Sequence, residues 1–189
     1  ERLDFVVHSI AFADRDWLRP GAFVETPRAS YLAAIDVSAY TLLAMGRLAR
    51  PQMKAGGGGS IVAMSYYGSE KVVPGYNVMG VAKAALACSC RHLASDLGPD
   101  NIRVNTIPGG PFRTLASSPV GGIDAMMEST PRHAPLRRHV AGPDVGGAAA
   151  FLLPDLPSAL TGDNVFVDCA TNLTRAAVCT PSPRAPPRP

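Results

Sequence analysis

Residues 60–107 decide the fold, and they read SIVAMSYYGSEKVVPGYNVMGVAKAALACSCRHLASDLGPDNIRVNTI. The run opens with an apolar, β-branched segment at 60–65 and closes with another at 102–107, each short enough for a buried strand. Between them, residues 76–97 have the length and apolar spacing of a helix, which Gly98 closes. A strand, a long helix and a second strand predict a βαβ unit with two parallel strands.

The same alternation continues upstream of this unit. Residues 3–10 read LDFVVHSI, a short run rich in apolar side chains that predicts a strand at 3–8. A loop follows, and Thr26 with Pro27 predicts the N-cap and first position of a long helix at 28–48. That helix carries apolar side chains on more than one face, so we expect cover from its own sheet and from a partner subunit.

Downstream of the unit the pattern keeps its order. Residues 108–111 are expected to end the third strand in a loop, because prolines stand at both ends of this segment. We predict a short helix near 123–127, a longer one at 144–153 and a fourth strand at 163–168. The whole pattern predicts an α/β protein with a parallel sheet of four strands, the first of which has an open edge.

Composition divides the chain into a body and a tail. Residues 1–172 have the periodicity of one folded domain, whereas 173–189 are proline-rich and without periodicity, which predicts a disordered tail. Three arginines in the tail account for the whole net charge of +3, so the body is electrically balanced. A balanced body offers no basic surface for phosphates, and we expect no nucleic-acid partner.

The segments that would signal a membrane or an oxidising compartment were not found. No apolar run approaches the roughly 18 residues of a membrane span, and no secretory leader opens the chain. Cys88 and Cys90 point about 200° apart around a helix, which suits neither a shared metal nor a mutual disulfide. We therefore expect reduced thiols, no metal site, no membrane contact and a cytoplasmic location.

The residues able to do chemistry gather where the second strand ends. Ligands in open α/β sheets bind outside the carboxyl ends of the strands. Tyr76 and Lys83 are seven residues apart and share one helix face, and a lysine near a tyrosine can lower the phenol pKa. Such a pair can donate a proton to an oxygen of a bound molecule. Tyr66, ten residues before Tyr76, is expected on the loop and could reach the same oxygen. From spacing alone, the simpler alternative is that Tyr76 is a core aromatic and Lys83 a solvated helix lysine.

Written out, the motif is Tyr66-x9-Tyr76-x6-Lys83, and it resembles the signature of the bacterial type I enoyl-acyl-carrier-protein reductases, in the short-chain dehydrogenase/reductase superfamily. Classical members of the superfamily place three residues between the tyrosine and the lysine, so a spacing of six is specific. The resemblance runs from about residue 3 to 172. Further matching stretches are VHSIAFA at 7–13, NIRVNTI at 101–107 and GPFRTLA at 110–116.

The resemblance implies a role for each residue of this motif. Tyr66 would donate a proton or a hydrogen bond to the enolate oxygen that forms on a trans-2-enoyl thioester, and Tyr76 is counted with the active site. Lys83 would hold the nicotinamide ribose hydroxyls, and Ala13 would contact the acyl substrate. The residues implied to contact the cofactor, besides Lys83, are Ile10, Phe112, Arg113, Thr114, Leu115 and Ala116.

The resemblance also implies partners and a lid. NADH is the expected cofactor, with NADPH as the alternative, and the substrate is bound to acyl carrier protein. The full-length protein is expected to form a homotetramer through the helices at 28–48 and 76–97. Residues from about 116 to 135 would form a mobile lid over the substrate.

The implied fold is a partial, Rossmann-like, doubly wound parallel sheet. Its first strands and glycine-rich turn have no counterpart in this chain, because the run Gly56–Gly59 precedes a strand instead of following one. We therefore expect that the 189-residue chain alone neither recognises the adenosine half of the cofactor nor catalyses the reaction. Pro108 stands where the family usually has serine, which removes a backbone N–H from the cofactor loop.

Two other functions stay open at this point. One is a different reductase of the same superfamily that acts on a 3-oxo or alcohol group, and the other is a non-catalytic truncated remnant. The six-residue spacing and Tyr66 argue against the first, since such a reductase would carry Tyr-x3-Lys and an upstream serine. A longer reading frame upstream of Glu1 would argue against the second.

Overall fold

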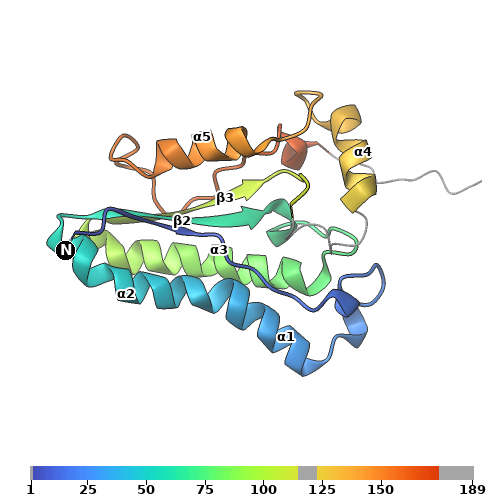
Figure 1. Ribbon diagram of the computed structural model, residues 1–189, viewed down its shortest axis with the longest axis horizontal. Helices are drawn as coiled ribbons and strands as arrows, with labels where there is room; N and C mark the ends of the chain where they lie inside the picture. Colours follow the sequence, from blue (N-terminus) through green and yellow to red (C-terminus); the bar gives the residue numbers. More distant parts are fainter. Residues whose placement is uncertain (1, 115–122, 175–189) are drawn as a thin grey trace, which may run out of the picture.

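A parallel sheet of three strands lies between two layers of helices (Figure 1). The computed structural model describes residues 2–114 and 123–174. The strands are β1 (Phe5–His8), β2 (Gly59–Tyr66) and β3 (Ile102–Gly109), in that spatial order. Both neighbouring pairs are parallel, and α3 (Asn77–Leu97) connects β2 to β3, so the predicted βαβ unit is confirmed.

The fourth strand predicted at 163–168 is wrong as a continuous strand. Among the described residues, this segment meets β3 only at two isolated parallel bridges, Thr106 with Asn164 and Gly109 with Val167. In a regular ladder the N–H of Pro108 would bond the carbonyl of Val165 between these bridges, and proline has no N–H. Pro108 lies inside β3, contrary to the predicted loop, and accepts from Val167 N–H at 3.0 Å. One missing donor therefore interrupts the outer pairing.

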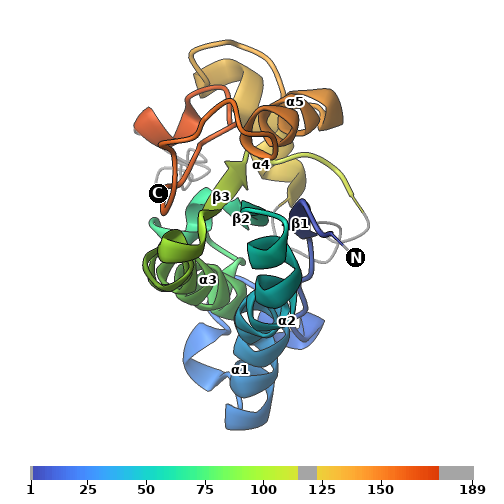
Figure 2. The same cartoon turned by 90° about the vertical axis from the view of Figure 1, so that its left-hand side faces the viewer.

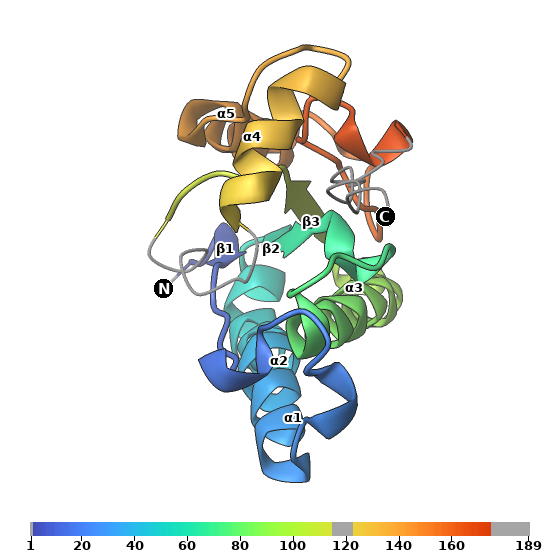
Figure 3. The same ribbon diagram turned by 90° about the vertical axis from the view of Figure 1, so that its right-hand side faces the viewer.

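The helices cover the two faces of the sheet unequally. On one face lie α1, α2 and α3, and on the other lies α5, while α4 stands at the end toward which the strands point (Figure 1). Their bounds are α1 Arg28–Ile35, α2 Thr41–Ala55, α4 Ile123–His133 and α5 Gly142–Leu152. This arrangement leaves the carboxyl ends of the strands between α4 and the loops near α1 (Figure 3).

Alternate side chains of each strand enter two separate cores. Ile61 and Ala63 of β2 pack in the core that α2 and α3 complete, through residues such as Leu42 and Leu86. Val62 faces the other way and packs in the core that α5 completes. Residues of β2 that lie two apart therefore share a helical layer, and this rule places the polar side chains discussed below.

The helix predicted at 28–48 is longer than expected and changes its pitch. Between α1 and α2 the chain makes a π-helical turn at Asp36–Tyr40, and α2 then continues through Pro51 to Ala55. Met53 in the added part is fully buried, so packing on the sheet carries the helix past the point where the apolar pattern fades. Tertiary contact thus extends an element whose sequence alone ends earlier.

The start of this helix also differs from the prediction. Thr26 is not the N-cap, because the helix begins at Arg28 and Pro27 is the residue before it. The Thr26 hydroxyl instead donates to the carbonyl of Phe23 at 2.8 Å, closing the preceding turn. The threonine and proline therefore predicted the position of the helix start correctly, but the predicted capping contact of Thr26 is wrong.

The run from Arg28 to Ala55 is long and apolar enough to cross a membrane by length and composition, which the sequence analysis did not expect. A single such helix is weak evidence, because the core helix of a soluble protein passes the same test. Here 33% of the apolar window is buried, and Leu42 is part of the core against the sheet.

The remaining helices deviate less from the predicted ranges. α3 begins one residue later than predicted, at Asn77, and ends at Leu97 as expected. α4 runs to His133, six residues beyond the predicted end at 127, and α5 begins two residues early, at Gly142. Of the predicted tail, the first residues follow a 3-10 turn at Thr171–Leu173, and the rest lies outside the described part of the chain.

The predicted open edge lies at β1. This strand pairs only with β2 among the described residues, and its other side faces outward (Figure 2). Phe5 and Val7 are 52% and 42% exposed. Such an edge presents both apolar side chains and unpaired backbone groups to whatever adjoins it.

Candidate functional site

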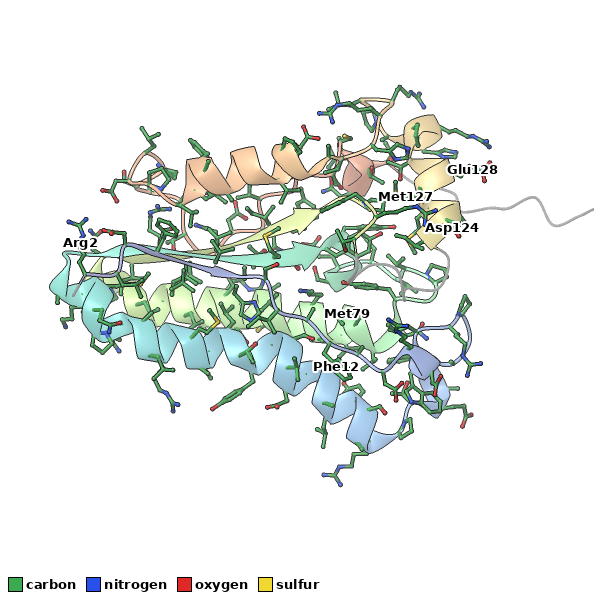
Figure 4. All side chains as sticks on the ribbon, viewed as in Figure 1. Arg2, Phe12, Met79, Asp124, Met127 and Glu128 are labelled. Atoms are coloured by element: carbon green, nitrogen blue, oxygen red, sulfur yellow. The ribbon has the colours of Figure 1, made fainter. Side chains whose placement is uncertain are left out.

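Three chain segments leave the sheet at one end. The loop after β1, the turn after β2 and the loop after β3 all begin at the carboxyl ends of parallel strands (Figure 3). Figure 4 shows Phe12 and Met79 on this side together with Asp124 of α4, and Arg2 at the opposite end. The predicted site residues come from these three segments and from the start of α3, so the fold gathers them at one edge.

The two motif tyrosines are in contact. Tyr66 is the last residue of β2, and Tyr76 immediately precedes α3. Their ring centroids are 4.9 Å apart at an edge-to-face angle of 69°, and Tyr67 lies on another side of Tyr66 at 4.7 Å. The Tyr66 hydroxyl is 3.5 Å from the sulfur of Met126, to which it donates a weak hydrogen bond. Tyr66 therefore lies between Tyr76 and the helix α4.

Burial keeps both phenols protonated. The pKa of Tyr66 is raised far above its usual range, first by burial and then by Tyr67 and Tyr76, and burial raises the pKa of Tyr76. The expected lowering of a phenol pKa by Lys83 is thus wrong for this state of the protein. Desolvation outweighs the attraction because the lysine ammonium is directed to a backbone carbonyl. At neutral pH both tyrosines are O–H donors.

Lys83 is a buried residue and not a solvated helix lysine. Its side chain reaches back along α3 to the end of β2, where Nζ donates to the carbonyl oxygen of Met64 at 2.7 Å. The residue is 6% exposed, and burial lowers the pKa of its ammonium to about 8. The simpler alternative made Tyr76 a core aromatic and Lys83 a solvated lysine. Tyr76 is indeed buried, but Lys83 is buried too, so the alternative fails for Lys83.

The loop residues implied to touch a cofactor or a substrate follow β1 and β3 at the same edge of the sheet. Ile10 after β1 is 40% exposed, and Ala13 packs against the buried cluster that contains Tyr76. Phe112 after β3 packs against the core under α5. Arg113 forms an ion pair with Asp124 of α4, so this loop and α4 are joined.

Part of the predicted site cannot be placed. Thr114 is exposed and ends the described portion of the loop after β3, whereas Leu115 and Ala116 lie outside the described residues. Of the lid predicted at 116–135, the described part is mostly α4. Met126 of α4 touches Tyr66, as a cover over the substrate would.

The motif did not identify three polar residues of this corner. His8 ends β1 and is fully buried, and its Nε2 is 2.7 Å from the hydroxyl oxygen of Thr41 on α2. Ser65 stands beside Tyr66 at the end of β2, and its hydroxyl oxygen is buried. The sequence did offer one signal for this corner, a histidine at the end of an apolar strand. A histidine buried in a core needs hydrogen-bond partners, so it indicates that other polar residues lie nearby.

The motif residues do not line either of two clefts in the described surface. One of about 500 Å³ is lined by residues of the α5 side such as Arg138 and Asp168, and one of about 540 Å³ lies at the amino ends of the strands near Arg2 and Gly58. Tyr66, Tyr76 and Lys83 line neither of them. No group of three or more His, Cys, Asp or Glu side chains able to hold a metal occurs within the ranges that the structure describes.

Comparison with known proteins gives one consistent result. Residues 1–171 match the family model described as Enoyl-(Acyl carrier protein) reductase. The chain is 52% identical over 167 residues to the enoyl-[acyl-carrier-protein] reductase [NADH] FabI of a Nostoc strain, covering 88% of this chain. It is 50% identical over 166 residues to the corresponding [NADPH] enzyme of Staphylococcus aureus, covering 88% of this chain.

A solved structure shows the same likeness. The enoyl-(acyl-carrier-protein) reductase of Anaplasma phagocytophilum in complex with NAD superposes with a TM-score of 0.85 at 47% identity, covering 91% of this chain. The chain spans 64% of the length of the Nostoc and Staphylococcus relatives and 64% of the Anaplasma structure. With matches this long and this similar, the chain belongs to the enoyl-(acyl carrier protein) reductase family.

Proposed function

We propose that this chain supplies the reacting half of an enzyme that reduces trans-2-enoyl-acyl-carrier-protein to the saturated acyl-acyl-carrier-protein, with hydride from NADH. One observation carries the proposal. A protonated Tyr66 touches Tyr76 and lies at the end of the strand whose Met64 carbonyl holds the buried Lys83. This places a proton donor and a positive charge together where ligands bind in open α/β sheets.

The proposed step needs a donor that acts on developing charge. NADH, when bound, supplies the hydride to the β-carbon of the enoyl thioester. Negative charge then develops on the thioester oxygen, and the O–H of Tyr66 donates to that oxygen. A proton from solvent then adds to the α-carbon, which completes the saturated chain and leaves Tyr66 with its own proton. Because burial raises its pKa, Tyr66 keeps its proton at neutral pH and does not lose it before the charge appears.

Lys83 is suited to hold the nicotinamide ribose. Met64 uses one of the three ammonium N–H groups, so at least one other remains to donate to the sugar hydroxyls. With its pKa near 8, the residue is mainly charged at neutral pH. Ile10 and Phe112 to Thr114 would contact the same half of the cofactor, and Ala13 the acyl chain. We extend the same assignment to Leu115 and Ala116.

The remainder of the cofactor needs groups that the described residues do not offer. A pyrophosphate is bound by backbone N–H groups at a helix N-terminus after a glycine-rich turn, and no strand in the described ranges is followed by such a turn. We propose that residues equivalent to the remaining part of the relatives bind the adenosine half. The choice of NADH over NADPH follows the Nostoc relative, although the Staphylococcus relative is an NADPH enzyme.

We further propose a cytoplasmic homotetramer built through α1, α2 and α3. Exposed apolar residues on α2 and at its start support this surface, among them Tyr40 at 49%, Leu43 at 45% and Leu48 at 71% exposure. Burying them against a second copy would cover apolar side chains that this helix exposes. The proposal includes no membrane or nucleic-acid partner.

A chimera tests the proposed chemistry. Residues 1–174 would be joined to the part of the Nostoc relative that they do not match, and hydride transfer would be followed in single turnovers of NADH with an enoyl-acyl-carrier-protein. We expect Tyr66→Phe to slow transfer by about 10²-fold while NADH affinity is largely kept, because the phenol acts on charge in the transition state.

Two further variants separate roles within the same chimera. Lys83→Ala should weaken NADH binding by at least about tenfold, since it removes charge-assisted hydrogen bonds. Lys71→Ala removes an ammonium from an exposed residue of the loop between β2 and α3 and should change neither quantity. If Tyr66→Phe lost affinity and kept its rate, the role assigned to Tyr66 would be wrong.

A further inference from the structure

His8 is fully buried and its hydrogen bonding specifies its protonation. The Thr41 hydroxyl has one proton, which it donates to the carbonyl of Val37 at 2.7 Å, one turn earlier in the helix. The 2.7 Å contact between Thr41 and His8 must then have the proton on His8 Nε2. Burial and the charge of Lys83 lower the pKa of His8 to about 4, so the ring is neutral. In this tautomer Nδ1 is an acceptor.

That acceptor has no hydrogen-bond partner among the described residues, and neither has the buried hydroxyl of Ser65. Both side chains lie on the helical face of the sheet that α2 and α3 cover. His8 contacts Thr41 of α2 directly, and Ser65 lies two residues after Ala63, which packs in the same core. Buried polar groups in folded proteins are almost always paired, so two such atoms in one corner need an explanation.

Lys83 stands in this corner with the complementary groups. His8 is aligned with Ala63 in the parallel ladder, and the next residue, Met64, is the one whose carbonyl accepts from Lys83 Nζ. Lys83 has up to two further N–H donors, of which one can serve the acceptors of this corner, His8 Nδ1 and Ser65 Oγ, while the other stays available for the sugar. The charge of Lys83 lowers the pKa of His8. The other residues that α2 and β2 place here carry no charge; they are Thr41, Ala63 and Ser65.

We propose that His8 is a positioning residue for Lys83. Thr41 holds the ring as the Nε2–H tautomer, Nδ1 accepts from a water that the Lys83 ammonium also binds, and Ser65 completes the same cluster. The ammonium is thereby oriented toward the carboxyl edge of the sheet. The functional meaning of this orientation rests on the proposed role of Lys83 in holding the cofactor, but the cluster itself is testable without cofactor or substrate.

The first measurement uses the unaltered 189-residue chain. Nitrogen-15 spectra of its labelled histidines distinguish the two imidazole tautomers. We expect His8 to be the Nε2–H form with a hydrogen-bonded Nδ1, unchanged between pH 6 and 7, whereas the exposed His92, His133 and His139 provide the reference signals. An Nδ1–H tautomer, or a charged ring at neutral pH, would overturn the proposal without any variant having to fold.

Two matched substitutions then separate hydrogen bonding from packing. His8→Gln keeps an amide that can reach Thr41 but loses the acceptor at the Nδ1 position, and His8→Asn keeps an oxygen near Nδ1 but cannot reach Thr41. The readout is the pKa of Lys83, followed by carbon-13 at its terminal methylene, which starts near 8. We expect Gln to lower it by about one unit and Asn to leave it nearly unchanged, because an acceptor stabilises the ammonium.

The remaining outcomes are decisive too. An equal shift in both variants would show that His8 acts only by filling space, and no shift in either would show that it does not contact the lysine; both overturn the proposal. Lys83→Met should move the Nδ1 signal of His8 toward that of an unpaired acceptor, and Ser65→Ala should shift the Lys83 pKa downward by less than His8→Gln. Neither measurement depends on whether the chain reduces enoyl thioesters.

Discussion

Val7 and Val62 are neighbours in the sheet, but they lie in different surroundings. The ladder aligns them directly, and each belongs to a short apolar run that predicted a buried strand. Val62 is fully buried in the core under α5, whereas Val7 is 42% exposed. The two sequences are equally suited to burial, so the difference comes from what lies on the far side. β2 has a strand on each side, and β1 has one on a single side among the described residues.

The candidate site follows this division. Tyr66, Lys83 and Ser65 belong to the covered middle of the fold, on β2 and α3, and their burial sets their protonation. His8 belongs to both regions, because its side chain is buried and its strand, β1, is the one at the open edge of the sheet. The difference shows that these candidate site residues are buried or half-buried while the strand beside them has an exposed edge. The four experiments below test that division, beginning with the largest expected effect.

The first is cofactor binding by the chain alone. If the open edge marks where the adenosine half would be bound, the purified chain should show no saturable NADH signal at micromolar cofactor. Several charge-assisted hydrogen bonds to the pyrophosphate are missing, and each is worth about 1.5–3 kcal/mol, which predicts a loss of more than about 10³-fold. Nicotinamide fluorescence and calorimetry would measure it. Saturable binding at micromolar NADH would show that the covered half suffices.

The second experiment uses the charge that is buried in the covered half. The pKa of Lys83 falls from 10.5 in the unfolded chain to about 8 in the folded one. Below pH 8 both states hold the proton. Between pH 8 and 10.5 the unfolded chain holds a proton that the folded chain has released, so the free energy of unfolding contributed by Lys83 rises with pH.

That rise should reach roughly 3 kcal/mol across the window, since one pKa unit corresponds to about 1.36 kcal/mol. Denaturant unfolding of the chain and of Lys83→Met would be compared at each pH. Cys90, whose pKa burial raises to about 12, acts in the opposite direction but is common to both proteins, so their difference isolates Lys83. An equal pH dependence in the two proteins would mean that Lys83 is solvated.

The third experiment tests the two valines directly. Val62→Ala removes two methyl groups from a filled core and should lower the free energy of unfolding by about 2 kcal/mol. Val7→Ala makes the same chemical change on the aligned residue at the open edge and should cost less than about 0.5 kcal/mol. Urea unfolding gives both values. Equal costs would mean that β1 is covered in solution by something beyond the described contacts, such as a second copy of the chain.

The fourth and smallest effect concerns the thiols in the helical layer. Cys88 is exposed on α3, while Cys90 is 1% exposed and its sulfur is 3.3 Å from the carbonyl of Val104. A thiol reagent should modify Cys88 in the folded protein and reach Cys90 only after unfolding. Peptide mapping after a short exposure would distinguish them. Rapid labelling of Cys90 would show that α3 opens readily.

Much of the architecture could be read from the sequence because it depends on local pattern. The βαβ unit of β2, α3 and β3 was predicted to within two residues at its strand ends, and the parallel pairing followed from it. The seven-residue spacing predicted that Tyr76 and Lys83 share one helix face, whereas α3 begins only after Tyr76. The family resemblance carried by Tyr66, Tyr76 and Lys83 is confirmed by the comparisons.

Other features depend on residues far apart in the chain, and local pattern could not supply them. Whether the segment at 163–168 forms a strand depends on one missing N–H in its neighbour, at Pro108, and α2 reaches Ala55 because Met53 finds a place beneath the sheet. The pKa of the tyrosines was predicted to shift in the wrong direction. Sequence spacing shows which charges are near a phenol, but it does not show how far the phenol is removed from water.

The sequence by itself thus determined the order of elements, the edge at which the candidate site residues meet and the family to which the chain belongs. Tertiary structure alone decided which side of each strand is covered, that Lys83 is buried and bonded to Met64, and that His8 meets Thr41 across 33 positions of sequence. The physical reason is that periodicity and spacing are properties of a local helix or strand. Burial, and the pKa values and hydrogen-bond partners that depend on it, are properties of the whole folded surface.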